Sequence, residues 1–136
     1  MQRANTLGNV TYLPFIPRES LFQEMAQHDC LLLPSRFDSF GMVVAEAMAV
    51  GVPALVTERV GAKCIIEEHP GSGWIVPVDA AAIKAQILWL MAHRAELAQA
   101  SAQARSAAQA YTWHRYGARA RSALLEIYER RAKGAK

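Results

Sequence analysis

Residues 30–57 read CLLLPSRFDSFGMVVAEAMAVGVPALVT, and this stretch decides the fold. Cys30–Leu33 is a continuous apolar run, which is typical of a strand covered on both faces. Gly41–Val50 has helical composition and ends at a Gly with a Pro shortly beyond, an ordinary helix stop. Ala54–Thr57 then predicts a second strand. A strand, a helix and a strand joined by short connections predict a right-handed crossover and a parallel sheet.

The same alternation continues on both sides of this stretch. Further strands are predicted at Asn9–Leu13 and Trp74–Val76, and a helix at Glu19–His28. Residues 79–110 contain 13 alanines and neither Gly nor Pro, so they are predicted to be helical, with Asp79 as the N-cap. The fold class is therefore α/β, a Rossmann-like parallel sheet with C-terminal helices. Four short strands without a Gly-rich phosphate turn indicate the later, incomplete part of a larger domain.

Charge divides the chain into two parts. The 136 residues have a net charge of +3, but residues 111–136 hold seven basic and two acidic side chains, whereas residues 1–110 hold eight and ten. We predict a partial Rossmann-like domain at 1–110 and an amphipathic helix at 111–136 that packs on it. The simplest interpretation of the basic charge is that this face of the helix is solvated. The alternative is that it contacts anionic lipid. Residues 1–110 lack aromatic side chains interleaved with basic ones, so we expect no nucleic-acid partner.

Composition excludes several classes of protein. With 52% hydrophobic and 20% charged residues, the chain has the composition of a globular protein. No apolar run approaches the roughly 20 residues that span a bilayer, and the first residues form no apolar secretory segment. Two cysteines are too few for a disulfide scaffold. We therefore expect a cytoplasmic protein, with contact at the inner face of the membrane as the possibility that the basic helix leaves open.

Two carboxylates flank the turn that follows the strand at Cys30–Leu33. Asp38 lies in the polar loop and Glu46 inside the helix, with seven residues between them. Ligands of parallel sheets bind beyond the carboxyl ends of the strands, where this loop lies. The unpaired amides of residues 40–43 suit a phosphate, and Gly41 allows close approach to the backbone. Glu46 is the only charge in an apolar helix, and sugar hydroxyls would satisfy it.

These residues also have purely structural explanations. Asp38 could cap the helix or its preceding turn, and Glu46 could pair with an arginine such as Arg18 or Arg36. The four histidines show no metal-ligand spacing, so we expect no metal site. Cys30 is most simply a buried strand residue, with a Cys–His nucleophile pair as the alternative.

With these residues identified, the chain resembles the C-terminal, donor-binding half of the family-four retaining glycosyltransferases, which have the GT-B fold. That family carries the segment Pro-Ser-x-x-Glu-x-Phe-Gly-x-x-x-x-Glu-Ala-Met-Ala-x-Gly-x-Pro. Residues 34–53 match it, with Asp38 in place of the first Glu. Residues 9–17, residues 73–79 and the Tyr-Thr-Trp-His run at 111–114 also resemble family segments, so the similarity covers nearly the whole chain.

The resemblance implies a role for each matching position. Glu46 would hold the ribose hydroxyls of the nucleotide. Asp38, as the catalytic position, would contact the hydroxyls of the donor sugar, although its side chain is one methylene shorter than the usual Glu. The remaining substrate-binding positions would be the backbone amides of Phe40, Gly41 and Met42 at the sugar and diphosphate, and the backbone around Phe15 and Ile16 at the base.

The resemblance also implies a reaction and its partners. Such enzymes transfer a hexose from a nucleotide-diphosphate sugar to a glycan or a lipid-linked acceptor, retain the anomeric configuration and need no metal or other cofactor. Lipopolysaccharide or another envelope glycan is the implied setting. The acceptor-binding N-terminal domain of such enzymes, and the Arg and Lys that grip the diphosphate, precede the part present here, so we expect the isolated chain to be inactive. The alternative function is a non-catalytic remnant or split subunit that binds a partner half through an exposed sheet edge.

Overall fold

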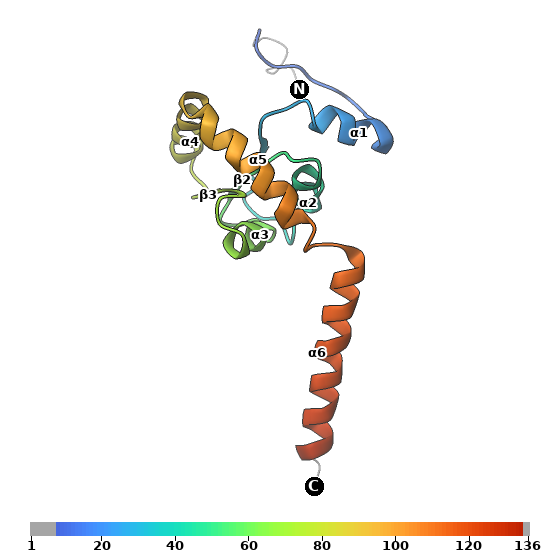
Figure 1. Ribbon diagram of the computed structural model, residues 1–136. Helices are drawn as coiled ribbons and strands as arrows, with labels where there is room; N and C mark the ends of the chain where they lie inside the picture. The colour runs from blue at the N-terminus through green and yellow to red at the C-terminus, as the bar shows by residue number, and fades with distance from the viewer. Residues whose placement is uncertain (1–7, 135–136) are drawn as a thin grey trace.

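The computed structural model describes residues 8–134, which form a three-stranded sheet with helices around it (Figure 1). The elements in chain order are α1 (Arg18–Met25), β1 (Leu31–Leu33), α2 (Met42–Ala49), β2 (Ala54–Thr57), α3 (Lys63–Glu68), β3 (Gly73–Val76), α4 (Ala80–Ala92), α5 (Arg94–Ala108) and α6 (Trp113–Gly134). The strands are parallel in the order β1-β2-β3. The predicted α/β, Rossmann-like fold class is confirmed.

The central strand β2 is buried on both faces, as its apolar sequence requires. Because successive side chains point to opposite faces, Ala54 and Val56 pack with α2, α3 and α5, whereas Leu55 packs with α4 and the start of α5. Two apolar layers therefore sandwich the sheet. They fix the carboxyl ends of β1 and β2 side by side at one edge.

Asp79 caps α4 as predicted. Its carboxylate accepts a hydrogen bond from the Ala82 amide at 2.8 Å. The predicted helical region that follows is two helices, because the backbone leaves helical geometry at His93 (φ −119°, ψ 63°). The His93 ring stacks on Trp89, with ring centroids 4.0 Å apart, at the junction between α4 and α5.

Removal of this cap gives a first test of the structure. Asp79→Ala leaves the Ala82 amide without its acceptor, so we expect the free energy of unfolding to fall by about 1 kcal/mol, measured by urea titration. Asp79→Asn keeps an acceptor oxygen and should recover most of the loss. Equal stability of Asp79→Ala and the parent chain would show that the cap contributes nothing.

Two features of the fold differ from the sequence-based expectation. The strand expected at Asn9–Leu13 is wrong: this segment pairs with no strand among residues 8–134, and Val10, Tyr12 and Leu13 are exposed. An apolar run becomes a strand only where a neighbour accepts its hydrogen bonds. The short helix α3 was not predicted, because its six residues are too few to show a helical period.

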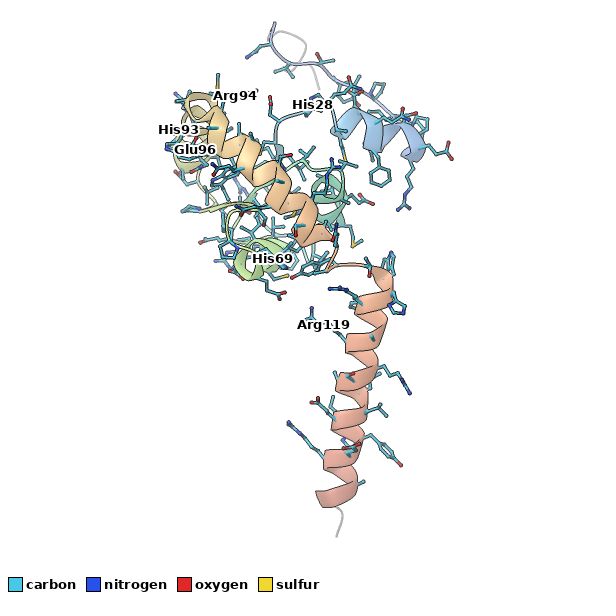
Figure 2. All side chains as sticks on the ribbon, viewed as in Figure 1. His28, His69, His93, Arg94, Glu96 and Arg119 are labelled. Carbon is cyan, nitrogen blue, oxygen red and sulfur yellow. The ribbon has the colours of Figure 1, made fainter. Side chains whose placement is uncertain are left out.

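The helix α6 runs away from the rest of the molecule after a turn at residues 109–112 (Figure 1). Its first turns meet the body, since Tyr116, Arg119 and Ala120 line a cavity together with Phe40 and Cys64. Figure 2 shows Arg119 on this near part of the helix. Beyond it, the apolar side chains of α6 are exposed. The expected packing of the C-terminal helix on the preceding domain is therefore seen only at its first turns.

No helix within residues 8–134 is long and apolar enough to cross a membrane.

Candidate functional site at the start of α2

The loops that follow β1 and β2 lie side by side at the carboxyl edge of the sheet. Asp38 forms an isolated parallel bridge with Val60. The Asp38 amide donates to the Arg59 carbonyl at 3.1 Å, and the Gly61 amide donates to the Asp38 carbonyl at 3.0 Å. Backbone hydrogen bonds therefore hold Asp38 in place, at the edge of the sheet where parallel α/β proteins bind their ligands.

Gly41 starts α2 in a conformation that few other residues adopt. Its φ is +84°, in the left-handed region, and it is the N-cap of the helix without a side-chain cap. A Cβ on Gly41 would lie 3.0 Å from Leu33 Cδ2 and 3.1 Å from Val60 Cγ1. Glycine is therefore required both by the backbone and by the close packing of this turn.

The first amides of α2 differ in their hydrogen bonding. The Val44 amide is paired with the Gly41 carbonyl at 2.9 Å, whereas the amides of Met42 and Val43 donate to no group among the described residues. Unpaired N–H groups and the helix dipole both favour an anion at this position. The phosphate that the sequence predicts at this position stays a prediction.

Asp38 also organises its own turn. Its carboxylate Oδ1 accepts a hydrogen bond from the Phe40 amide at 3.1 Å. The Phe40 amide was expected to be free for a ligand, and in the structure it is already paired. Asp38 therefore caps the turn before α2, which is the structural role considered for it above. Its second carboxylate oxygen has no hydrogen-bond partner among the described residues.

Glu46 lies one turn into α2, on the same face as Met42. Its Oε1 is 3.6 Å from Arg18 Nη2, and the Glu46 side chain is 27% exposed whereas that of Arg18 is 81% exposed. Of the two arginines proposed as alternatives, Arg18 is the partner. An ion pair with so exposed an arginine contributes little to stability, so Glu46 remains accessible to a ligand.

The structure places the expected site residues in two groups. Asp38, Phe40, Gly41, Met42 and Glu46 surround the start of α2. Phe15 and Ile16 lie in the segment that leads into α1; Phe15 is 83% exposed and Ile16 is half-buried. The Arg18–Glu46 contact brings the start of α1, which follows this segment, to α2.

The other candidate chemistry is not supported by the geometry. Burial raises the pKa of the Cys30 thiol to about 11, so Cys30 stays protonated and is a poor nucleophile. Within residues 8–134, no group of three or more His, Cys, Asp or Glu side chains is placed to hold a metal ion. Figure 2 shows His28, His69 and His93 at separate places in the fold.

Sequence reasoning missed the loop that follows β2. Residues 58–61 carry Arg59 and Val60 to Asp38, and a Cβ on Gly61 would collide with the Ser39 carbonyl and lie 2.9 Å from Phe40 Cα. The sequence did contain a signal for this contact. The loop follows the predicted buried strand Ala54–Thr57, which places it at the same carboxyl edge of the sheet as Asp38.

The chain is similar to several known proteins. Residues 1–107 match the family model described as glycosyl transferases group 1. The chain is 32% identical over 123 residues, 90% of its length, to a D-inositol 3-phosphate glycosyltransferase of Jonesia denitrificans. It is 38% identical over 95 residues, 65% of its length, to an amylovoran biosynthesis glycosyltransferase of Erwinia amylovora.

A solved structure gives the same result for the fold. Sucrose-phosphate synthase from Thermosynechococcus elongatus superimposes with a TM-score of 0.75 and 26% identity over 99% of the chain. The chain spans 28% of the Jonesia protein, 23% of the Erwinia protein and 33% of the synthase chain. The motif at residues 34–53, the parallel sheet and the family match agree, and the chain belongs to the glycosyl transferases group 1 family.

Proposed function

We propose that this chain binds the nucleotide-sugar donor of a retaining glycosyltransferase reaction, as the donor-binding part of a larger enzyme. The observation that carries the proposal is the start of α2, where two carboxylates flank the unpaired amides of Met42 and Val43. These amides suit a diphosphate. Carboxylates at Asp38 and Glu46 suit the hydroxyls of a sugar and a ribose, because hydrogen bonds to a charged acceptor are the stronger ones.

In this arrangement each residue has a separate task. Glu46 accepts hydrogen bonds from the ribose hydroxyls, and these hydrogen bonds replace its ion pair with the exposed Arg18. Asp38 uses its free oxygen for the donor sugar, while its other oxygen keeps the Phe40 turn closed. The backbone near Phe15 and Ile16 contacts the base. Asp38 then orients the donor sugar, and catalysis depends on that orientation. The reaction requires no metal ion or other cofactor.

The acceptor is proposed to bind to a different part of the enzyme from the part that binds the donor. The chain spans about a quarter of the curated relatives described above, which supports a missing N-terminal domain that binds a glycan or lipid-linked acceptor. The name of the Erwinia relative, an amylovoran biosynthesis enzyme, supports envelope or surface glycan synthesis as the setting. We place the reaction in the cytoplasm, at the inner face of the membrane.

Glu46→Gln tests this proposal. The parent chain should bind UDP- or GDP-sugars with millimolar or tighter affinity in a calorimetric titration. Replacing the charged acceptor should weaken that binding about 10-fold or more, since hydrogen bonds to charged groups contribute about 1.5–3 kcal/mol.

Two variants control for structural effects. Glu67→Gln alters an exposed carboxylate that pairs with Lys63 on α3, and it should leave affinity unchanged. Arg18→Ala removes the ion pair without removing the acceptor, and it should leave affinity unchanged or raise it. Binding that ignores Glu46→Gln, or that falls equally in Arg18→Ala, would contradict a ribose-binding role.

A second candidate function is a non-catalytic subunit that pairs with a partner half through β1. Within residues 8–134, β1 has a neighbouring strand on one side only, and Leu32 on it is 42% exposed. Open edges of parallel sheets are suited to pairing with a further strand. Such a subunit would show no nucleotide-sugar binding that depends on Glu46, so the same titration separates the two functions.

A further inference from the structure

The end of β2 carries a buried hydroxyl group in an otherwise apolar strand. Thr57 is 0% exposed, and among residues 8–134 the buried polar side chains are those of Thr57 and Ser72. A hydroxyl group that is removed from water costs free energy unless it is hydrogen-bonded. The Thr57 hydroxyl donates to the carbonyl oxygen of Ser35 at 2.5 Å. It therefore links the end of β2 to the loop that follows β1.

This link lies where the backbone ladder between β1 and β2 ends. Leu33 and Val56 form the last register pair of the two strands. The residue after Leu33 is Pro34, which has no amide hydrogen to donate to a neighbouring strand. The Thr57 hydroxyl holds the carbonyl of the next residue, Ser35. A side chain therefore continues the connection between the two segments beyond the last backbone pair.

The loop that carries Asp38 is held against the segment after β2 at three points. Backbone hydrogen bonds to the segment 59–62 hold it at Asp38 and at Phe40. The Thr57 hydroxyl holds it at Ser35, and of these three anchors it is the one that a side chain supplies. Because a group that orients a ligand needs a fixed position, loss of this anchor would leave the direction of the Asp38 carboxylate less well defined.

We infer that Thr57 is a positioning residue for the donor sugar. Its buried hydroxyl fixes the loop in the position at which the free carboxylate oxygen of Asp38 meets the sugar. This inference rests on the proposed function, in which Asp38 contacts the sugar and Glu46 contacts the ribose. Thr57 acts through Asp38 and does not touch the donor. Small displacements of an orienting group cause large losses, because the interaction depends on geometry.

Two substitutions separate the hydroxyl group of Thr57 from its packing. Thr57→Val keeps the branched shape and removes the hydroxyl, whereas Thr57→Ser keeps the hydroxyl and removes a methyl group. Calorimetric titration of the 136-residue chain uses the UDP- or GDP-sugar that the parent chain binds most tightly. Thr57→Val should weaken this binding about 5-fold or more, and Thr57→Ser should stay within about 2-fold of the parent.

Free UDP or GDP provides the readout that a merely structural role would not give. These nucleotides lack the sugar, so their binding depends on Glu46 and on the first amides of α2 and not on Asp38. Thr57→Val should therefore bind the free nucleotide as tightly as the parent chain does. A general loosening of the fold would weaken the nucleotide and the nucleotide sugar by the same factor.

Amide hydrogen exchange measures the anchoring without any donor. In Thr57→Val the amides of Asp38 and Phe40 should exchange about 5-fold or more faster than in the parent chain, because the loop opens more easily. Thr57→Ser should exchange like the parent. The Ala82 amide, which Asp79 caps at the start of α4, is the internal control and should be unchanged in both variants.

Failure of this inference is distinguishable from failure of the proposed function. If Glu46→Gln weakens donor binding and Thr57→Val does not, the role of Thr57 is overturned and the proposed function stands. Equal losses for the nucleotide sugar and the free nucleotide, or equal exchange in the Val and Ser variants, would overturn the role of Thr57 in the same way. A parent chain that binds no nucleotide sugar would contradict both, whatever the exchange rates are.

Discussion

Gly61→Ala is expected to lower the free energy of unfolding by about 3 kcal/mol, as measured by urea titration of the 136-residue chain. The added Cβ would overlap the Ser39 carbonyl oxygen and lie 2.9 Å from Phe40 Cα. Both are backbone atoms, so no side chain can rotate to relieve the contact. The loops after β1 and β2 must separate, which breaks the 3.0 Å hydrogen bond from the Gly61 amide to the Asp38 carbonyl.

Gly117→Ala provides the control for this substitution. A Cβ on Gly117 has no atom within 4 Å, and the residue lies inside α6. Alanine is the better helix former, so this variant should keep or slightly raise stability. If Gly61→Ala were as stable as Gly117→Ala, the close approach of the two loops would not exist in solution.

The parts of the fold that the sequence predicted are those that local patterns determine. The buried strand Ala54–Thr57 and the apolar helix after Gly41 carry composition, punctuation and length that agree with one another, and both were predicted within a residue or two. Asp79 was recognised as a cap because a helix start needs a side-chain acceptor. Such signals lie within a few residues of the element that they describe.

The errors involve partners that lie far along the chain. Asn9–Leu13 has the composition of a strand, but no strand in the described part of the chain, residues 8–134, pairs with it. The amphipathic pattern of α6 predicted correctly that the helix has an apolar face, yet it does not say what that face contacts. Pattern and propensity describe what a segment can bury, and only the tertiary structure decides where.

The candidate site shows the same division. The motif at residues 34–53 located Asp38, Gly41 and Glu46 correctly around one helix start. The sequence did not decide between Arg18 and Arg36 as the partner of Glu46, because either arginine has the charge to pair with the carboxylate. It also missed the loop of residues 58–61, whose contact with Asp38 arises only when β1 and β2 pair in register.

Leu55→Ala should cost about 3 kcal/mol of unfolding free energy, within the range of 2–5 kcal/mol typical of buried leucines. Leu55 is 1% exposed and packs with Val76, Leu90 and Leu97, so its removal leaves a cavity between the sheet and the two helices that cover this face. Leu32→Ala is an unusually close control, since Leu32 is the register partner of Leu55 on β1 and is 42% exposed. It should lose less than about 1 kcal/mol, because little apolar surface leaves the core. Thermal or urea unfolding of the two variants measures the difference. Similar losses in both would mean that a further layer covers β1 in solution, and that Leu32 is as buried there as its partner.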